Sequence, residues 1–204
     1  MSKVLVTESY LTDISNAIRS KNGSSTKYKP SEMAAAIKSL TGGSGQDNTV
    51  LNSILDRSIS GNYVNDDLTE IGRYAFAYCT NITSATFTKA AKIRSAAFYS
   101  CNSLESISLP EVKKIEERTF NYCNLKYISM PKIEMLGSDN EYNGIFDVYC
   151  KITTINIPST IQSIGKRAFE YSNITTINID KPANSISGSP WGATKATVNW
   201  TGTM

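Results

Sequence analysis

The sequence predicts an α+β repeat protein, in which a β-solenoid follows a small helical hairpin at the N-terminus. Three observations indicate this fold. Phe followed by Cys or Ser recurs at a nearly fixed interval after residue 75, apolar residues around it recur in step, and residues before 42 follow a helical period instead. A repeat of this length cannot bury its apolar side alone and does so by stacking on its neighbours. Any function is therefore expected to belong to the surfaces of the stack.

Residues 1–41 are predicted to form the helical hairpin, which would serve as an attachment module. Leu11, Ile14 and Ile18 fall on one face of a helix, and Ser31 is a suitable N-cap for a second helix. Two helices this short cannot build a large core of their own, so we expect them to dock on another surface.

Three further segments follow the hairpin. Residues 42–48 begin with two glycines and are predicted to be a linker. Residues 49–65 are expected to cap the solenoid and to start its first strand at 59–61, because the open end of a stack exposes apolar surface. Residues 66–200 hold the repeats and end in a degenerate closing repeat, in which Trp191 takes the aromatic position.

Each repeat places apolar residues at corresponding positions. The last two of each unit are two residues apart, which is the spacing of a strand with one buried side. The Phe residues at the aromatic position of successive units are separated by 22, 22, 26 and 23 residues, so the fourth unit contains an insertion. The aligned positions are Ile71, Phe76, Cys79, Ile82, Ala85 and Phe87; Ile93, Phe98, Cys101, Leu104, Ile107 and Leu109; Ile115, Phe120, Cys123, Leu125, Ile128 and Met130; Leu136, Phe146, Cys150, Ile152, Ile155 and Ile157; and Ile164, Phe169, Ser172, Ile174, Ile177 and Ile179.

The four Cys residues all occupy one position of the repeat, and Ser172 takes that position in the fifth unit. Exchange of Cys for Ser at a repeat position is typical of a small buried residue rather than of a disulfide. The chain has no Cys-x-x-Cys pair and no His, so zinc-site spacing is absent. We expect free thiols, no metal and no cofactor.

The repeat resembles a known family. The run Leu68-x-x-Ile71-Gly72-x-x-Ala75-Phe76-x-x-Cys79-x-x-Ile82-x-x-Ala85-x-Phe87, and a copy that ends in Leu104-Glu105-Ser106-Ile107-Ser108-Leu109-Pro110, closely resemble the BspA-like leucine-rich repeat. The resemblance covers about residues 66–200 and rests on several residue types that recur together at fixed offsets. It implies a leucine-rich-repeat solenoid.

A second resemblance concerns the N-terminal hairpin. Segments 10–19 and 29–37, with a Gly turn between them, look like the short helical module of tail and fibre proteins from bacteriophages of Gram-positive hosts. Joined to BspA-like repeats, this module implies a phage or prophage virion component. The expected location is the virion, after synthesis in the host cytoplasm. The expected partners are a host cell-surface glycan or protein, or other virion tail proteins, and a homo-oligomer is left open.

Composition and charge exclude two classes of partner. The net charge of +3 arises from residues 1–46, because residues 47–204 carry fifteen basic and fifteen acidic side chains. A neutral repeat region lacks the basic surface that nucleic-acid binding requires. The N-terminus shows no apolar stretch of signal-peptide type, and no run is long enough to span a bilayer. We therefore expect neither nucleic-acid binding nor membrane insertion, and no export signal.

An enzyme is not expected. Without His, a Ser-His-Asp or Cys-His arrangement cannot form. The adjacent carboxylates Asp66-Asp67 and Glu116-Glu117 would point apart on a strand or turn. The leading hypothesis is a phage tail-associated binding module. The alternatives are a purely structural tail assembly protein and a BspA-like bacterial surface interaction protein.

Two sets of residues are candidates for binding. Strand residues between the buried ones face outward, and stacking aligns them in two nearly uncharged columns of hydroxyl and amide groups. Such columns suit a neutral glycan or the flat polar face of a protein, although Ser and Thr are also common in strands for structural reasons. The insertion forms a loop that either binds or reflects length variation. The candidates are Ser106, Ser108, Tyr127, Ser129, Thr154, Asn156, Thr176 and Asn178 on strands, and Asp139, Asn140, Glu141 and Tyr142 in the loop.

Overall fold

The computed structural model describes residues 57–137 and 144–203, and the structural statements that follow refer to these residues. They contain strands and turns but no helix. The predicted helical hairpin, the linker and the first part of the predicted cap lie outside the described residues. The described part of the chain is a β-solenoid, as the repeats predict.

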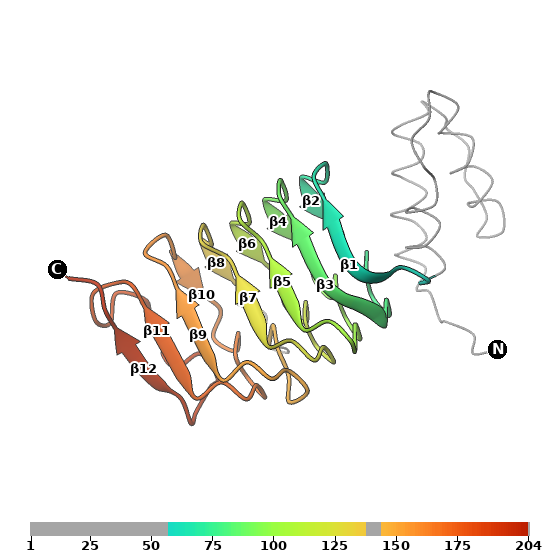
Figure 1. Ribbon diagram of the computed structural model, residues 1–204. Coiled ribbons are helices and arrows are strands. Elements are labelled where there is room, and N and C mark those ends of the chain that lie inside the picture. The colour runs from blue at the N-terminus through green and yellow to red at the C-terminus, as the bar shows by residue number, and fades with distance from the viewer. Residues whose placement is uncertain (1–56, 138–143, 204) are drawn as a thin grey trace, which may run out of the picture. The chain divides into compact units, whose positions relative to one another are not determined.

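The first five coils each contribute one strand to each of two sides of the solenoid, and the last two described coils contribute β11 and β12 to the first side alone (Figure 1). We call the first side the strand face; its strands join as β1-β3-β5-β7 and β9-β11-β12, and the second sheet has the order β10-β8-β6-β4-β2. Every ladder is parallel. The strand face consists of β1 (Ser60–Asn65), β3 (Asn81–Phe87), β5 (Ser106–Ser108), β7 (Tyr127–Ser129), β9 (Thr154–Ile157), β11 (Thr176–Ile179) and β12 (Thr197–Trp200), and the second sheet of β2 (Glu70–Ile71), β4 (Lys92–Ile93), β6 (Lys114–Ile115), β8 (Met135–Leu136) and β10 (Ser163–Ile164).

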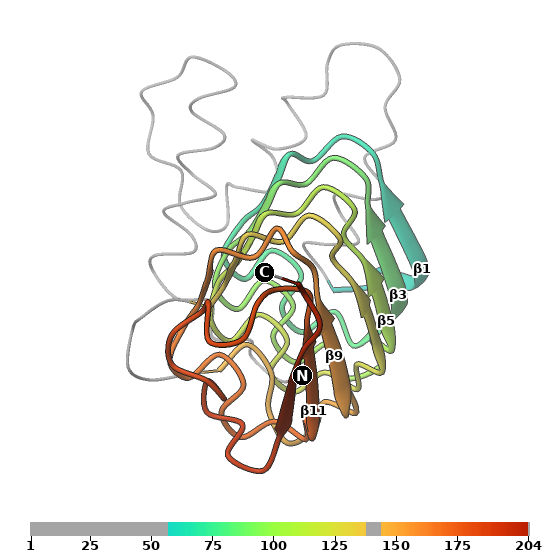
Figure 2. The same ribbon diagram turned by 90° about the vertical axis from the view of Figure 1, so that its left-hand side faces the viewer.

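The third side of each coil is an arc of tight turns, and the coils overlie one another in a view along the stack (Figure 2). Alternate amides bond within the coil and to the next coil: Cys79 donates to Phe76, and Phe76 donates to Ala97. The first coil holds left-handed backbone at Tyr74 (φ 57°) and Tyr78 (φ 63°). Because this conformation costs a residue with a Cβ about 1–2 kcal/mol, bonds to the next coil must hold it in place.

A column of Phe rings forms the centre of the core. Phe76, Phe98, Phe120, Phe146 and Phe169 lie one per coil, with successive ring centroids 5.2, 5.7, 5.7 and 6.4 Å apart. Neighbouring rings are inclined by no more than 17°, and all five side chains are buried. Burial of each ring contributes about 1.5–3 kcal/mol, which no coil could obtain without its neighbours.

The predicted core positions are confirmed with two exceptions. Every aligned residue is buried except Ile128 and Ser172, which are half-buried. Ser172 occupies the position that Cys holds in the other units, and its hydroxyl donates to the Phe169 carbonyl of its own coil at 2.7 Å. Ile128 lies at an interruption of the strand face.

The first strand also agrees with the sequence. It was expected to start at 59–61, and β1 begins at Ser60 and pairs with β3 along its whole length. Tyr63 of β1 packs against Phe76 and Phe87, with centroid distances of 5.3 and 5.6 Å. The strand therefore shares the core of the first repeat.

The closing repeat covers the other end of the core. Trp191 takes the aromatic position, is buried, and meets Phe169 edge-on at a centroid distance of 6.4 Å. Trp200 packs against Trp191 at 6.1 Å, and β12 pairs with β11 over four residues. Removal of this repeat would expose the Phe169 ring and the edge of β11.

Truncation after residue 180 should therefore cause aggregation or the loss of cooperative unfolding. Solenoid stability is close to a sum of coils and interfaces, and a terminal interface exposed to water favours association. Thermal melting followed by circular dichroism, together with size-exclusion chromatography, checks this. A soluble protein that ends at residue 180 and melts cooperatively would contradict the role of the closing repeat.

Candidate functional site

The strand face carries outward-facing polar residues, as predicted. The buried residues Ile107, Ile155 and Ile177 alternate with residues that are exposed or half-exposed, and Tyr127 is 72% exposed. The ladders set the register of the polar residues. They align Ser84 with Ser106 and Tyr127, Thr86 with Ser108 and Ser129, Thr154 with Thr176 and Thr197, and Asn156 with Asn178 and Asn199.

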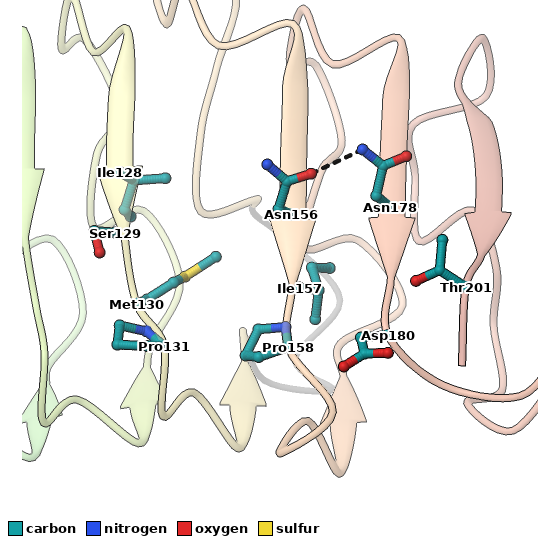
Figure 3. Close-up of a pocket in the computed structure, with 10 residues that line it drawn as sticks. All are labelled: Ile128, Ser129, Met130, Pro131, Asn156, Ile157, Pro158, Asn178, Asp180 and Thr201. Carbon is teal, nitrogen blue, oxygen red and sulfur yellow. Dashed lines mark hydrogen bonds between the residues drawn. The ribbon is translucent and has the colours of Figure 1, made fainter. Parts of the chain in front are cut away.

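One of these rows is a ladder of side-chain amides. Asn199 donates to Asn178 at 2.9 Å, and Asn178 donates to Asn156 at 2.8 Å. All the bonds run in one direction, so the amide nitrogen of Asn156 ends the ladder and is turned toward β7 (Figure 3). The ladder fixes these side chains and leaves an amide N–H donor at its end.

The strand face is interrupted between β7 and β9. No ladder joins these two strands, and none of their Cα atoms approach within 8 Å of each other. The expectation of two continuous columns is therefore wrong at this point. The coils stay joined elsewhere, because the Lys151 amide donates to the Leu125 carbonyl at 2.8 Å and β10 pairs with β8.

A groove occupies the interruption (Figure 3). Its volume is about 690 Å³, within the range of binding sites for small ligands. The side chains of Met130 and Ile157 are buried, whereas Asn156 and Asp180 are exposed. The groove thus combines an apolar interior with a polar rim. The lining residues are Ile128, Ser129, Met130, Pro131, Asn156, Ile157, Pro158, Asn178, Asp180 and Thr201.

The inserted loop remains a prediction. Asp139, Asn140, Glu141 and Tyr142 lie outside the described residues. The eight candidate residues on β5, β7, β9 and β11 all lie on the strand face. Three of them, Ser129, Asn156 and Asn178, also line the groove.

The sequence reasoning missed a row of tyrosines outside the two sheets. Tyr78, Tyr99, Tyr122 and Tyr149 lie one per coil, with successive ring centroids 5.8, 5.2 and 5.2 Å apart. Burial and the neighbouring rings of Tyr122 and Tyr78 raise the pKa of Tyr99. Tyr78, Tyr122 and Tyr149 are between 42% and 56% exposed. Their offset from the preceding Phe varies from one to three residues, which hides the row from a search at fixed period.

Ion pairs lie outside the polar columns. Glu116 lies near three cations, Lys92, Arg94 and Lys114, and other pairs join successive coils. The inter-coil pairs include Lys113–Glu134, Lys126–Glu105 and Lys132–Glu111, with nitrogen–oxygen distances of 2.9, 2.8 and 2.6 Å. Exposed pairs of this kind contribute little each. Because these charged side chains lie outside the columns, the columns consist of uncharged groups.

The Cys position is structural. All four thiols are free and buried, which confirms the prediction. Cys101 donates to the Phe76 carbonyl and Cys123 to the Phe98 carbonyl, each at 3.0 Å, so the thiols join coil to coil. Among the residues that the structure describes, no group of three or more His, Cys, Asp or Glu could hold a metal ion. In the same residues no helix is long and apolar enough to cross a membrane.

Comparison with known proteins agrees with the repeat type. Residues 58–143 match the family model of the BspA type leucine-rich repeat region, in six copies. The repeats in this range are therefore similar to leucine-rich repeats of the BspA type. A solved structure of a leucine rich cell surface protein from Faecalibacterium prausnitzii A2-165 is similar at 13% identity and a TM-score of 0.37, over 74% of this chain and 62% of that one. The chain thus spans less than two thirds of that protein. No curated protein matches the sequence.

Replacement of Cys101 by Ser should destabilise the fold by only about 1 kcal/mol or slightly more. A hydroxyl at this position can donate to the Phe98 carbonyl three residues back, as Ser172 does to Phe169. Chemical denaturation measures the difference. Alkylation of the native parent should also be slow at all four thiols, and fast labelling of all four would contradict their burial.

The stability of the protein should fall with alkaline pH through Cys150. Burial raises the pKa of this thiol to about 11, whereas an unfolded thiol ionises near about 8.5. Because the folded pKa is the higher one, the neutral thiol stabilises the fold fully below about pH 8.5. This contribution is lost between about pH 8.5 and 11, at about 1.4 kcal/mol per pH unit.

The variant Cys150→Ser is the matched control, since it keeps all other ionisable groups. Urea denaturation of parent and variant between pH 8 and 10.5 should give a stability difference that shrinks as the pH rises. A difference that stays constant over this range would show that the Cys150 thiol does not ionise differently in the two states.

Proposed function

We propose that this protein is a non-enzymatic binding module of a phage or prophage tail, and that its strand face binds a receptor on the host surface. The observation that supports this most is the pair of uncharged polar columns held in register, with a groove between β7 and β9. A parallel sheet fixes the spacing of these side chains, so a ligand meets donors and acceptors that are already ordered.

The chemistry of the face fits a neutral glycan or a flat polar protein surface. The outward groups are hydroxyls, amides and the Tyr127 ring, which bind by hydrogen bonds and stacking rather than by charge. The ladder of Asn156, Asn178 and Asn199 also satisfies these side chains without a ligand, which is the structural explanation for the same residues. A ligand would bind to the donor and acceptor atoms of these side chains that make no hydrogen bond within the ladder.

Assignment to a virion rests on the N-terminal segment. Its resemblance to the helical module of tail and fibre proteins favours a protein that is assembled into the particle and that attaches through residues 1–41. A homo-oligomer would multiply the number of binding faces on one tail.

Two other functions are alternatives. A structural tail protein would use the same face against other virion proteins. A bacterial surface interaction protein is favoured by the BspA type of the repeats at residues 58–143. A comparison of binding to cell walls with binding to tail proteins distinguishes the structural tail protein from a receptor-binding protein.

The double variant Thr176→Lys and Asn178→Lys should fold normally and lose binding. Both side chains alternate along β11 with the buried residues Ile177 and Ile179 and point away from the core, so two lysines obstruct the face without entering the core. We expect binding of the full chain to purified Gram-positive cell walls, in a pull-down, to fall by at least about tenfold.

Gln162→Lys with Thr194→Lys is the matched control, because it adds the same charge at exposed positions outside the strands of this face. It should bind as the parent does. If the folded Thr176 and Asn178 variant binds cell walls and tail proteins as well as the parent, recognition lies elsewhere, and the loop at 139–142 or the segment 1–41 becomes the better candidate.

A further inference from the structure

The groove between β7 and β9 is a wedge in an otherwise regular sheet. At its closed end the amide of Lys151 donates to the Leu125 carbonyl at 2.8 Å. Past this bond the strands diverge, and no Cα atom of β7 lies within 8 Å of one in β9. Adjacent strands of a sheet lie about 4.8 Å apart, so two strands with one more strand between them lie about 10 Å apart. The strands beside the gap are therefore farther apart than directly paired strands, which leaves an opening between two strand edges.

Both edges of the gap carry backbone groups that pair with no other strand. In a parallel ladder, successive residues direct their N–H and C=O groups to opposite sides. The Ser129 carbonyl accepts from Leu109 on the β5 side, so the backbone groups of Ile128 face the gap. The Ile157 carbonyl accepts from Asp180 on the β11 side, so those of Thr154 and Asn156 face the gap from β9.

The core is also incomplete at this point. Ala85, Ile107, Ile155 and Ile177 occupy the same position of their coils as Ile128 and are no more than 3% exposed. Ile128 is half-buried, because β9 does not lie against β7. In Figure 3 the side chains of Ile128 and Met130 extend from β7 toward the gap. An apolar side chain placed between them and Ile157 would complete the row.

We propose that this groove binds an extended peptide segment of a partner protein, which inserts between β7 and β9 as an additional strand. The inference names the ligand class of the binding face and so rests on the proposed function. An inserted strand pairs its backbone with Ile128 on one side and with Thr154 and Asn156 on the other. This is strand addition, in which backbone bonds give affinity and alternate side chains give specificity.

The lining residues define the segment. One apolar side chain fills the space beside Met130 and Ile157, and its neighbours in sequence point outward. An outward acceptor meets the amide nitrogen of Asn156, which the amide ladder leaves as a donor at the rim. Among the described residues that line the groove, Asp180 is the one ionisable residue, so a neutral or basic peptide is favoured over an acidic one. A glycan lacks the regular donors and acceptors that two strand edges require.

Amide hydrogen exchange followed by NMR tests the inference on the full chain. In the free protein the amides of Ile128, Thr154 and Asn156 should exchange rapidly, while the ladder amides of Ile155 and Ile177 should be protected. Heptapeptides selected from a random displayed library should slow exchange at the three gap amides by at least about tenfold. Protection of these amides in the free protein, or selected peptides that bind without protecting them, would overturn the proposal.

Two substitutions at one position separate backbone pairing from side-chain recognition. Asn156→Pro removes the N–H that faces the gap but leaves the amides of Ile155 and Ile157, which pair with β11. Asn156→Ala keeps that N–H and removes the side-chain amide. Peptide affinity should fall at least tenfold more in Asn156→Pro than in Asn156→Ala. Equal losses in two folded variants would overturn strand insertion, and the exchange measurement decides the matter if Asn156→Pro does not fold.

The test also distinguishes this inference from the proposed function. If peptides protect the gap amides but the Thr176 and Asn178 double variant still binds cell walls, host recognition by the strand face is wrong and peptide insertion stands. The opposite outcome is that the double variant loses cell-wall binding, while neither the selected peptides nor the protein fraction of the cell walls slows hydrogen exchange at the gap amides. The strand face then binds its receptor, but not as an inserted strand, and the inference is overturned.

Discussion

The whole structure depends on the requirement that each coil bury its apolar side against the next. A single coil has a short strand, an arc of turns and a two-residue strand, and none of these could hold together in water alone. The Phe column meets this requirement most directly, because its rings lie flat on one another through five coils. The buried thiols add coil-to-coil bonds beside it.

Stacking also determines the outer surfaces. Once the coils are in register, equivalent residues of successive coils must lie side by side, so a residue type that recurs in sequence becomes a row in space. The amide ladder of Asn156, Asn178 and Asn199 and the row of Tyr78, Tyr99, Tyr122 and Tyr149 both arise in this way. Each row presents one kind of chemistry over several coils, which suits recognition of an extended partner.

The interruption at β7 and β9 shows that the three sides of a coil need not all stay paired. The second sheet continues from β8 to β10, and the arc continues because the Ile145 amide donates to the Ala168 carbonyl at 2.8 Å. These contacts, with the unbroken Phe column, keep the coils stacked while two strands separate. The separated strands lose only a few backbone bonds, each with a net value of about 1 kcal/mol, since water can replace the partner. A binding groove is therefore possible in a regular solenoid at small cost.

The sequence by itself determined the repeat, nearly all of the core residues and the outward direction of the polar strand residues, because burial in a stacked coil leaves a period that is visible along the chain. It also indicated the buried thiols, through the exchange of Cys with Ser172. The gap beside Ile128 was decided by the tertiary structure alone. Ile128 is apolar like the buried residues at the same position of other coils, and it differs from them only because its neighbouring strand is farther away. The Tyr row also depended on the tertiary structure, because the stacked arcs bring residues at unequal offsets from Phe into contact. Periodic patterns report which side of a coil is buried, whereas the spacing between coils is fixed only when the chain has folded.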